Sequence, residues 1–270
     1  MPIATLPLVL AVVLVELALG GAFLVWMLDR SRQAPAGSLR LIAAVDAGAA
    51  TLAFLLVPTL PRGELAEAAS LQVGAIEAFA QGVPVVLVLL VAQLVTTFLP
   101  LPPLRAIVGV VALLAGGLVL MAAAVARPRP EAPYDVFALL ALPLGALALG
   151  GVAGAMLLGH WYLITPKLSP GPLQRATFVV VVAIALQTGI VGVTLARGEL
   201  VGAWETALWV AIGIRIGVGL LMSLALVLAG WWTARMNTQS STGLLYVALG
   251  TVLAGEVAAR VIFYLTGVAV

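Results

Sequence analysis

The chain has 270 residues, of which 63% are hydrophobic and only 9% are charged, whereas a soluble domain carries about a quarter charged residues, so the composition excludes a water-soluble globular protein. The net charge of +2 comes from few ionisable side chains that form no basic patch, which excludes nucleic-acid binding. The absence of cysteine excludes disulfides and any cysteine-ligated zinc or iron–sulfur site in this chain.

Eight apolar stretches are each long enough to cross a hydrocarbon core of about 30 Å as a helix. Breaks rich in proline, arginine and glycine separate them, and no loop between them is long enough for a soluble domain. We therefore expect an all-α, polytopic membrane helix bundle that forms one transmembrane domain over residues 1–270. The expected spans are 4–28, 39–60, 83–100, 104–126, 136–164, 173–195, 206–233 and 242–268.

A short repeat links the first and the fifth expected spans. The sequence Leu-Ala-Leu-Gly-Gly occurs at residues 17–21 and again at 147–151, in two spans that run in the same direction. This pattern favours two four-helix halves related by a parallel repeat. A chance match in a chain rich in leucine, alanine and glycine is the alternative. In either case, small residues allow the backbones of membrane helices to approach closely.

Basic residues predict the orientation of the bundle. With an even number of spans, both termini lie on one side, and the face that carries more arginine and lysine is expected to be cytoplasmic. We therefore expect a multi-pass protein of the bacterial cytoplasmic membrane with both termini outside the cytoplasm. The richer face carries Arg30, Arg32, Arg40, Arg105, Lys167, Arg175 and Arg235, and the opposite face carries Arg62, Arg127, Arg129 and Arg197.

Tryptophans mark the ends of the expected spans. Such rings are enriched at the two membrane–water interfaces, so we assign them to an aromatic belt rather than to a ligand site. Trp26, Trp161, Trp231 and Trp232 fall at the cytoplasmic ends, and Trp204 and Trp209 fall at the other face.

Five ionisable residues fall inside the expected spans. A charge at the centre of a bilayer helix costs about 2.5–3.5 kcal/mol on insertion scales, so each of them needs a physical reason. Counted along the helices at 1.5 Å per residue, all five lie in one layer about 9 Å thick, together with Gln93 and Gln187. We expect one polar network made of Glu16, Asp46, Arg215, Glu256 and Arg260.

The members of this layer have different expected roles. Glu256 and Arg260 are four residues apart on one helix face and can pair directly, and Arg215 lies at matching depth on the antiparallel neighbouring span. These charges are either a buried clamp between the last two spans or part of a functional site. Because two arginines face three acids, we expect Glu16 or Asp46 to be protonated and to act in proton relay.

The only histidine lies at the cytoplasmic end of the fifth span, in the sequence Gly159-His160-Trp161-Tyr162. An imidazole between aromatic rings at a membrane interface can bind a quinone head group and exchange a proton with it. The helix-breaking Pro166 that follows favours a shaped pocket. His160, Trp161 and Tyr162 are therefore the candidate quinone-binding residues, and an interfacial histidine in an aromatic belt is the alternative.

The last span resembles a known family. Residues 254–260, Ala-Gly-Glu-Val-Ala-Ala-Arg, followed by Phe263-Tyr264, are similar to the last helix of the DMSO-reductase membrane anchor, and Gly20-Gly21-Ala22-Phe23 is similar to a Gly-Gly-x-Phe stretch in its first helix. That family carries a quinol-site histidine after its second helix and a glutamate in its third. Here no histidine occurs in 60–82 and no acid in 83–100, and Glu77 is expected just before the third span.

The resemblance to this family and its relatives, the NrfD-like and polysulfide-reductase anchors, implies a function. It implies a quinone-interacting membrane anchor subunit of a respiratory oxidoreductase, which passes electrons and protons between menaquinone or ubiquinone and an iron–sulfur or haem partner subunit. Of the family's site positions, only Glu256 and Arg260 transfer. We expect no metal bound by this chain.

Two other functions remain open at this stage. A secondary, proton-coupled transporter would use the same charged layer as its substrate and ion site, and it would favour a discontinuous helix, for which Pro143 and Gly150-Gly151 in the fifth span are the candidate position. A membrane enzyme that acts on lipid would need a cluster of histidine and acidic residues, and the sequence offers no such set.

Overall fold

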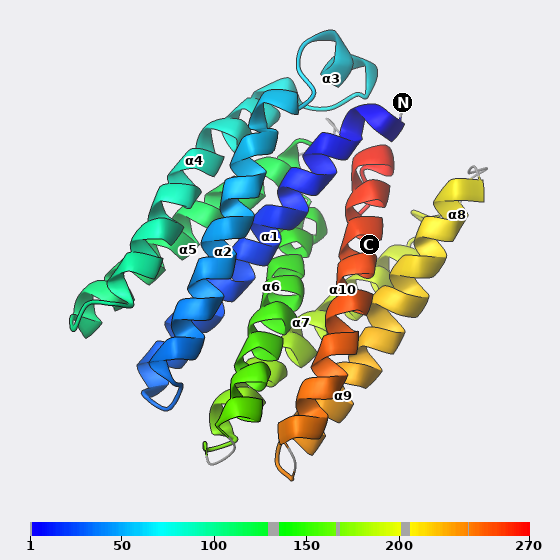
Figure 1. The fold of residues 1–270 in the computed structure, drawn as a ribbon. Coiled ribbons are helices and arrows are strands. Elements are labelled where there is room, and N and C mark those ends of the chain that lie inside the picture. The colour runs from blue at the N-terminus through cyan, green and yellow to red at the C-terminus, as the bar shows by residue number, and fades with distance from the viewer. Residues whose placement is uncertain (1, 129–134, 166–167, 201–205, 237) are drawn as a thin grey trace.

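In a computed structural model the chain is a bundle of long helices (Figure 1). The structure describes residues 2–128, 135–165, 168–200, 206–236 and 238–270. In this part of the chain, eight helical stretches are long and apolar enough to cross a membrane. The expected all-α polytopic bundle is therefore confirmed. Arg129, Pro166, Lys167 and Trp204, which entered the predictions above, lie outside the described residues.

The first four spans are built by α1, α2, α4 and α5, and the last four by α6, α7, the continuous stretch α8–η2–α9, and α10. A 3₁₀ turn, η1, extends α2, and a short helix, α3, lies in the loop that follows. The bounds are α1 Pro2–Ser31, α2 Ala36–Leu56, η1 Val57–Thr59, α3 Glu64–Ala68, α4 Val73–Thr96, α5 Pro102–Val125, α6 Val136–Ile164, α7 Gly171–Ala196, α8 Thr206–Gly213, η2 Ile214–Met222, α9 Ser223–Thr233 and α10 Thr238–Thr266.

Most of the predicted bounds are close to the observed ones, but the third was wrong at its start. Helix α4 begins at Val73, ten residues before the expected residue 83, so Glu77 is an exposed residue of the helix rather than part of the preceding loop. The prediction followed the apolar stretch, which begins only after Gly82. Backbone hydrogen bonding continues through the more polar residues before it, and Pro84 is accommodated inside the helix.

The two halves of the bundle pack in the same way. Helix α1 packs on α2 and α5, and its counterpart α6 packs on α7 and α10. In the same way, α2 packs on α4 in the first half and α7 packs on α9 in the second. Helix α4 packs on α5 as the η2–α9 stretch packs on α10. Across the halves, α1 contacts α6 and α10 while α6 contacts α1 and α5. This correspondence supports two four-helix halves related by a pseudo-two-fold axis between α1 and α6.

The repeated glycines form the crossing of α1 and α6. A methyl carbon at Gly20 would overlap the main-chain oxygen of Ala146, and one at Gly150 would overlap the main-chain oxygen of Leu17. Only glycine permits two helix backbones to touch in this way. The repeat at 17–21 and 147–151 therefore lies where the two halves meet (Figure 1).

The chain turns back after the last helix. Gly267 has a φ of 71° and is followed by three buried residues, 268–270. Arg127, at the end of α5, donates from Nη1 to the main-chain oxygen of Gly267 at 2.6 Å, and the hydroxyl of Thr194 donates to that of Ala269 at 3.0 Å. Arg127 was expected in an external loop, but it is fully buried and joins the first half to this segment.

Candidate functional site

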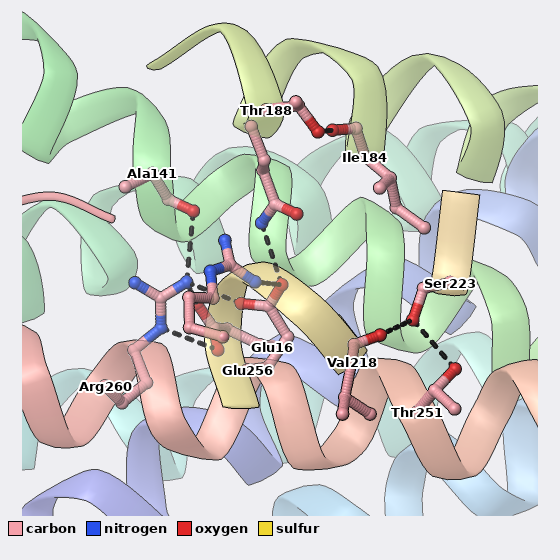
Figure 2. Close-up of polar contacts among 11 residues, drawn as sticks. Glu16, Ala141, Ile184, Thr188, Val218, Ser223, Thr251, Glu256 and Arg260 are labelled. Atoms are coloured by element: carbon pink, nitrogen blue, oxygen red, sulfur yellow. Dashed lines mark hydrogen bonds and ion pairs between the residues drawn. The ribbon is translucent and has the colours of Figure 1, made fainter. Parts of the chain in front are cut away.

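Arg260 is the centre of a buried group of charged side chains. Its Nε donates to Oε2 of Glu16 at 3.1 Å, and its Nη2 lies 2.9 Å from Oε1 as an ion pair without a hydrogen bond. The same Nη2 lies 2.9 Å from Oε2 of Glu256 and donates to the main-chain oxygen of Ala141 at 3.1 Å (Figure 2). The predicted pair of Glu256 and Arg260 on one face of α10 is confirmed, and a carboxylate from α1 joins it.

The other oxygen of Glu256 has two further donors. Oε1 accepts from Arg215 Nη1 at 2.9 Å and from Gln187 Nε2 at 2.9 Å. Each of the four charged side chains is at most 1% exposed. Two carboxylates and two guanidiniums balance each other, so the group has no net charge when all four are ionised. We call Glu16, Arg215, Glu256 and Arg260 the charge cluster.

Local backbone features make room for the charge cluster. Arg215 lies in η2, a π-helix whose wider turns are frequent at functional sites. Gly145 of α6 faces the cluster, because a methyl carbon there would lie 2.8 Å from Oε1 of Glu16 and 2.8 Å from Oε2 of Glu256. Directly after the π-helix, Ser223 at the start of α9 donates to the Thr251 hydroxyl at 2.8 Å and so joins this stretch to α10 (Figure 2).

Asp46 does not join the charge cluster, so the prediction of one five-residue network was wrong for this residue. Its side chain is only 3% exposed, and among the described residues its Oδ2 has no hydrogen-bond partner. The carboxyl group lies against Gly21, where a methyl carbon would be 2.6 Å from Cγ. Depth along a helix was deduced correctly, but α2 packs on α1, α4 and α6 and does not reach the helices that carry Arg215 and Arg260.

A cavity of about 310 Å³ opens between one end of α1, α2, α4 and α5. Gln93 is buried at its wall and donates from Nε2 to the main-chain oxygen of Ala22 at 3.1 Å. Asp29 and Arg105 also line it and form an ion pair at 3.0 Å. Its polar lining residues are Trp26, Asp29, Arg32, Gln93, Thr96, Thr97 and Arg105.

A second hollow, of about 420 Å³, is lined in part by the same tryptophan. It is an apolar groove between α1, α5 and α6, and Trp26 lines both the groove and the cavity. The indole lies against Gly109, where a methyl carbon would be 2.7 Å from Cδ1. Within the described residues, the buried Nε1 of Trp26 has no acceptor. The apolar lining residues include Leu19, Phe23, Leu113, Gly117, Leu120 and Pro143.

The three residues predicted to hold a quinone point in different directions. His160 is exposed, and its Nδ1 lies 2.9 Å from the hydroxyl of Tyr246. Trp161 lies against Gly37 of α2, whereas Tyr162 is fully buried and donates to the main-chain oxygen of Ser169 at 2.5 Å. Consecutive residues of a helix are about 100° apart, so they cannot surround one ring. None of the three lines the cavity or the groove.

From the sequence, we assigned Trp26 to the aromatic belt and placed Gln93 in the polar layer, without a role at a ligand site. A signal was present, because a glutamine in an apolar span is as unusual as a charge, and Thr96-Thr97 follow it on the same helix. The positions of these residues along the chain do not predict which helices pack around them to form the cavity.

Comparison with known proteins gives no relative: no family model, no curated protein and no solved structure matches the chain. The resemblance to the DMSO-reductase anchor therefore stays a prediction.

Proposed function

We propose that this chain binds a membrane quinone and is the quinone-binding subunit of a multisubunit oxidoreductase. The observation that carries the proposal is that Trp26 lines both a cavity with several polar side chains and an apolar groove. A quinone has the matching form, since a flat head group with two carbonyl oxygens continues into an isoprenoid tail. The cavity would hold the head group, and the groove would hold the first part of the tail.

Two side chains offer hydrogen-bond donors to such a head group. The buried indole N–H of Trp26 has no acceptor in the described part of the chain, which is costly unless a ligand supplies one. Gln93 uses one amide hydrogen on Ala22, and its amide group has a second. A quinone carbonyl accepts hydrogen bonds from both, and the indole ring offers a flat apolar face to the quinone ring.

The oxidation of a quinol requires a partner that accepts the electrons. Oxidation of a quinol to a quinone releases two electrons and two protons. We propose that the electrons pass to an iron–sulfur or haem-containing partner subunit and that the protons leave through this chain's polar residues. Reduction of a quinone to a quinol takes up two electrons and two protons. Co-purification tests this part: a redox-active subunit isolated with the tagged chain supports it, and a homogeneous chain from gently solubilised membranes contradicts it.

Quinone binding to the purified chain tests the site. Trp26→Leu and Gln93→Leu each remove one donor, and loss of one such hydrogen bond lowers affinity about tenfold. His160→Ala is the control, because His160 lies in the other half and outside the cavity. If His160→Ala weakens binding and Trp26→Leu does not, the head group binds at the position first predicted from the sequence, and the Trp26 cavity is excluded.

The proposed location is the bacterial cytoplasmic membrane, with both termini outside the cytoplasm. The excess of arginine at the end of the bundle that holds the cavity supports this orientation. It would place the cavity on the cytoplasmic side. Reporter fusions after Arg32, Glu67 and Val270 test it, and an external signal at Arg32 together with a cytoplasmic one at Val270 would reverse it.

A proton-coupled transporter is the second candidate. The expected break in the fifth span does not occur, because α6 is continuous from Val136 to Ile164 through Pro143 and the glycine pair. The irregularity lies instead in the seventh span, where η2 carries Arg215 of the charge cluster. A transporter predicts solute-dependent proton uptake into liposomes that Arg215→Gln abolishes, whereas a quinone-binding subunit predicts none.

A further inference from the structure

Asp46 lies between the cavity and the charge cluster along α1. Its carboxyl group contacts Gly21, and Gln93, which lines the cavity, binds the main-chain oxygen of the next residue, Ala22. Glu16 lies five residues from Gly21 on the same helix, which corresponds to about 7.5 Å of helix rise. One stretch of α1 therefore has the cavity at one end, Asp46 in the middle and the charge cluster at the other end.

Among the described residues, no charged side chain forms an ion pair with Asp46, and Arg32 lines the neighbouring cavity. Helix α2 packs on α1, α4 and α6, and none of the ionisable residues described on these helices is paired with Asp46. An ionised carboxylate buried without a partner is very costly, so the neutral acid is the favoured form. The interactions are Glu16 with Arg260, Asp29 with Arg105, Arg30 over the Trp26 ring, Arg40 over the Phe98 ring, and His160 with Tyr246, while Glu77 is exposed.

We propose that Asp46 is held as a neutral carboxylic acid and is the group that exchanges protons with the cavity. This inference deepens the proposed function, and the role of Asp46 toward quinone rests on that function. When a quinol in the cavity loses two electrons to the partner subunit, it releases two protons. Both protons leave to water through the mouth of the cavity, one of them directly and the other by exchange with the proton that Asp46 holds.

Geometry distinguishes Asp46 from Glu16, the other carboxyl group considered for this role. Both oxygens of Glu16 are within 3.1 Å of Arg260, so a buried cation compensates its charge, although Oε1 has no hydrogen-bond partner among the described residues. Asp46 has no cation, and Gly21 leaves space for the acid group against α1. A side chain at residue 21 would displace that group from its position.

Infrared spectroscopy of the purified chain tests the protonation state without any quinone. The wild type is expected to show the carbonyl stretching band of a protonated carboxylic acid at neutral pH, and Asp46→Asn is expected to lose it. Asp46→Asn should also retain the thermal stability of the wild type, because one neutral group replaces another of the same shape. Absence of the band in the wild type, or its persistence in Asp46→Asn, overturns the inference.

Deuterium exchange of the same band tests the connection to the cavity. Ala106 of α5 lines the cavity. In D₂O the band shifts as the acid proton exchanges, and Ala106→Trp, which fills the cavity, should slow this shift at least about tenfold because water then reaches Asp46 only through local opening. Gly117→Leu, which fills the apolar groove, is the matched control and should leave the rate unchanged. Equal exchange rates in wild type and Ala106→Trp would show that water does not reach Asp46 through the cavity.

The role toward quinone has its own readout in the assembled complex. Asp46→Asn should lower quinol oxidation about a hundredfold, the usual contribution of a positioned proton-transfer group, with quinone affinity unchanged. Unchanged turnover would overturn the relay to quinone. If no quinone binds but the infrared results are as expected, the proposed function fails, while Asp46 stands as a proton-exchanging group of the cavity.

Discussion

The corresponding ends of the two halves of the bundle are packed differently. In the first half, the ends of α1, α2, α4 and α5 enclose the cavity that Trp26 and Gln93 line. At the corresponding end of the second half, Gly159 lies against Thr242, and Ser241 donates to the main-chain oxygen of Gly230 at 2.8 Å. Small residues there bring the helices together, so a shared helix arrangement gives a binding space only where side chains hold the helices apart.

In the membrane interior the contrast is reversed. The second half supplies Arg215, Glu256 and Arg260, and α1 contributes Glu16 from across the boundary. The first half has a buried carboxyl group, Asp46, without a cation, and α4 buries no ionisable residue, since Glu77 is exposed and Val83, Val86 and Leu90 are apolar. The second half therefore holds the bundle together by charge, and the first half offers space for a ligand. Four substitutions, from the largest expected effect to the smallest, test this division.

Arg260→Ala should cause the largest loss of stability. It leaves Glu16 and Glu256 buried with one remaining guanidinium between them, and removing one partner of a buried pair costs about 3–5 kcal/mol in soluble proteins. Intramembrane polar contacts measured elsewhere are weaker, so about 3 kcal/mol is expected. Thermal unfolding in detergent measures it. Arg260→Lys should lose less, and an unchanged melting temperature in Arg260→Ala would contradict a stabilising charge cluster.

Gly150→Ala should separate the two halves. The added methyl group overlaps the backbone of α1 at Leu17 and Gly20, and such overpacking costs about 1–3 kcal/mol. Gly189→Ala in α7 is the matched control, since a methyl group there meets nothing within 4 Å and should stabilise the helix by up to about 1 kcal/mol. Equal stability of the two variants would show that the glycine crossing does not join the halves.

Arg105→Ala should have a small effect on stability. Its ion pair with Asp29 is partly exposed, with 24% and 20% of the two side chains accessible, and such pairs contribute about 1 kcal/mol or less. Added salt should reduce the difference from the wild type further. A loss as large as that of Arg260→Ala would mean that the cavity mouth, like the charge cluster, stabilises the bundle.

His160→Ala should change stability least, by no more than about 0.5 kcal/mol, because the side chain is exposed and makes one described hydrogen bond. Chemical denaturation compared with Tyr246→Phe, which removes the same contact from the other side, measures it. A larger loss in His160→Ala than in Tyr246→Phe would assign His160 an interaction beyond this hydrogen bond.

The sequence predicted the fold better than the site, for physical reasons. Hydrophobic length determines where a helix can cross a membrane, and the spacing of Glu256 and Arg260 determines a contact on one helix. Depth along a helix follows from counting residues, which placed Glu16 and Arg215 correctly. The contacts of a side chain depend on which helices are neighbours, and the sequence does not give this packing. The helix packing seen in the structure shows that Asp46 lies apart from the charge cluster, and it is the reason that we now propose a pocket at Trp26 instead of His160.

The central claim is that the quinone head group binds in the first half of the bundle, and a photoreactive quinone tests it most directly. After illumination of the purified chain, the attached label is located by mass spectrometry of its peptides. We expect the label on residues around Trp26 at the end of α1 and on 93–106, and we expect excess unlabelled quinone to prevent labelling. Competable labelling confined to residues around His160 and Tyr246 would contradict the account.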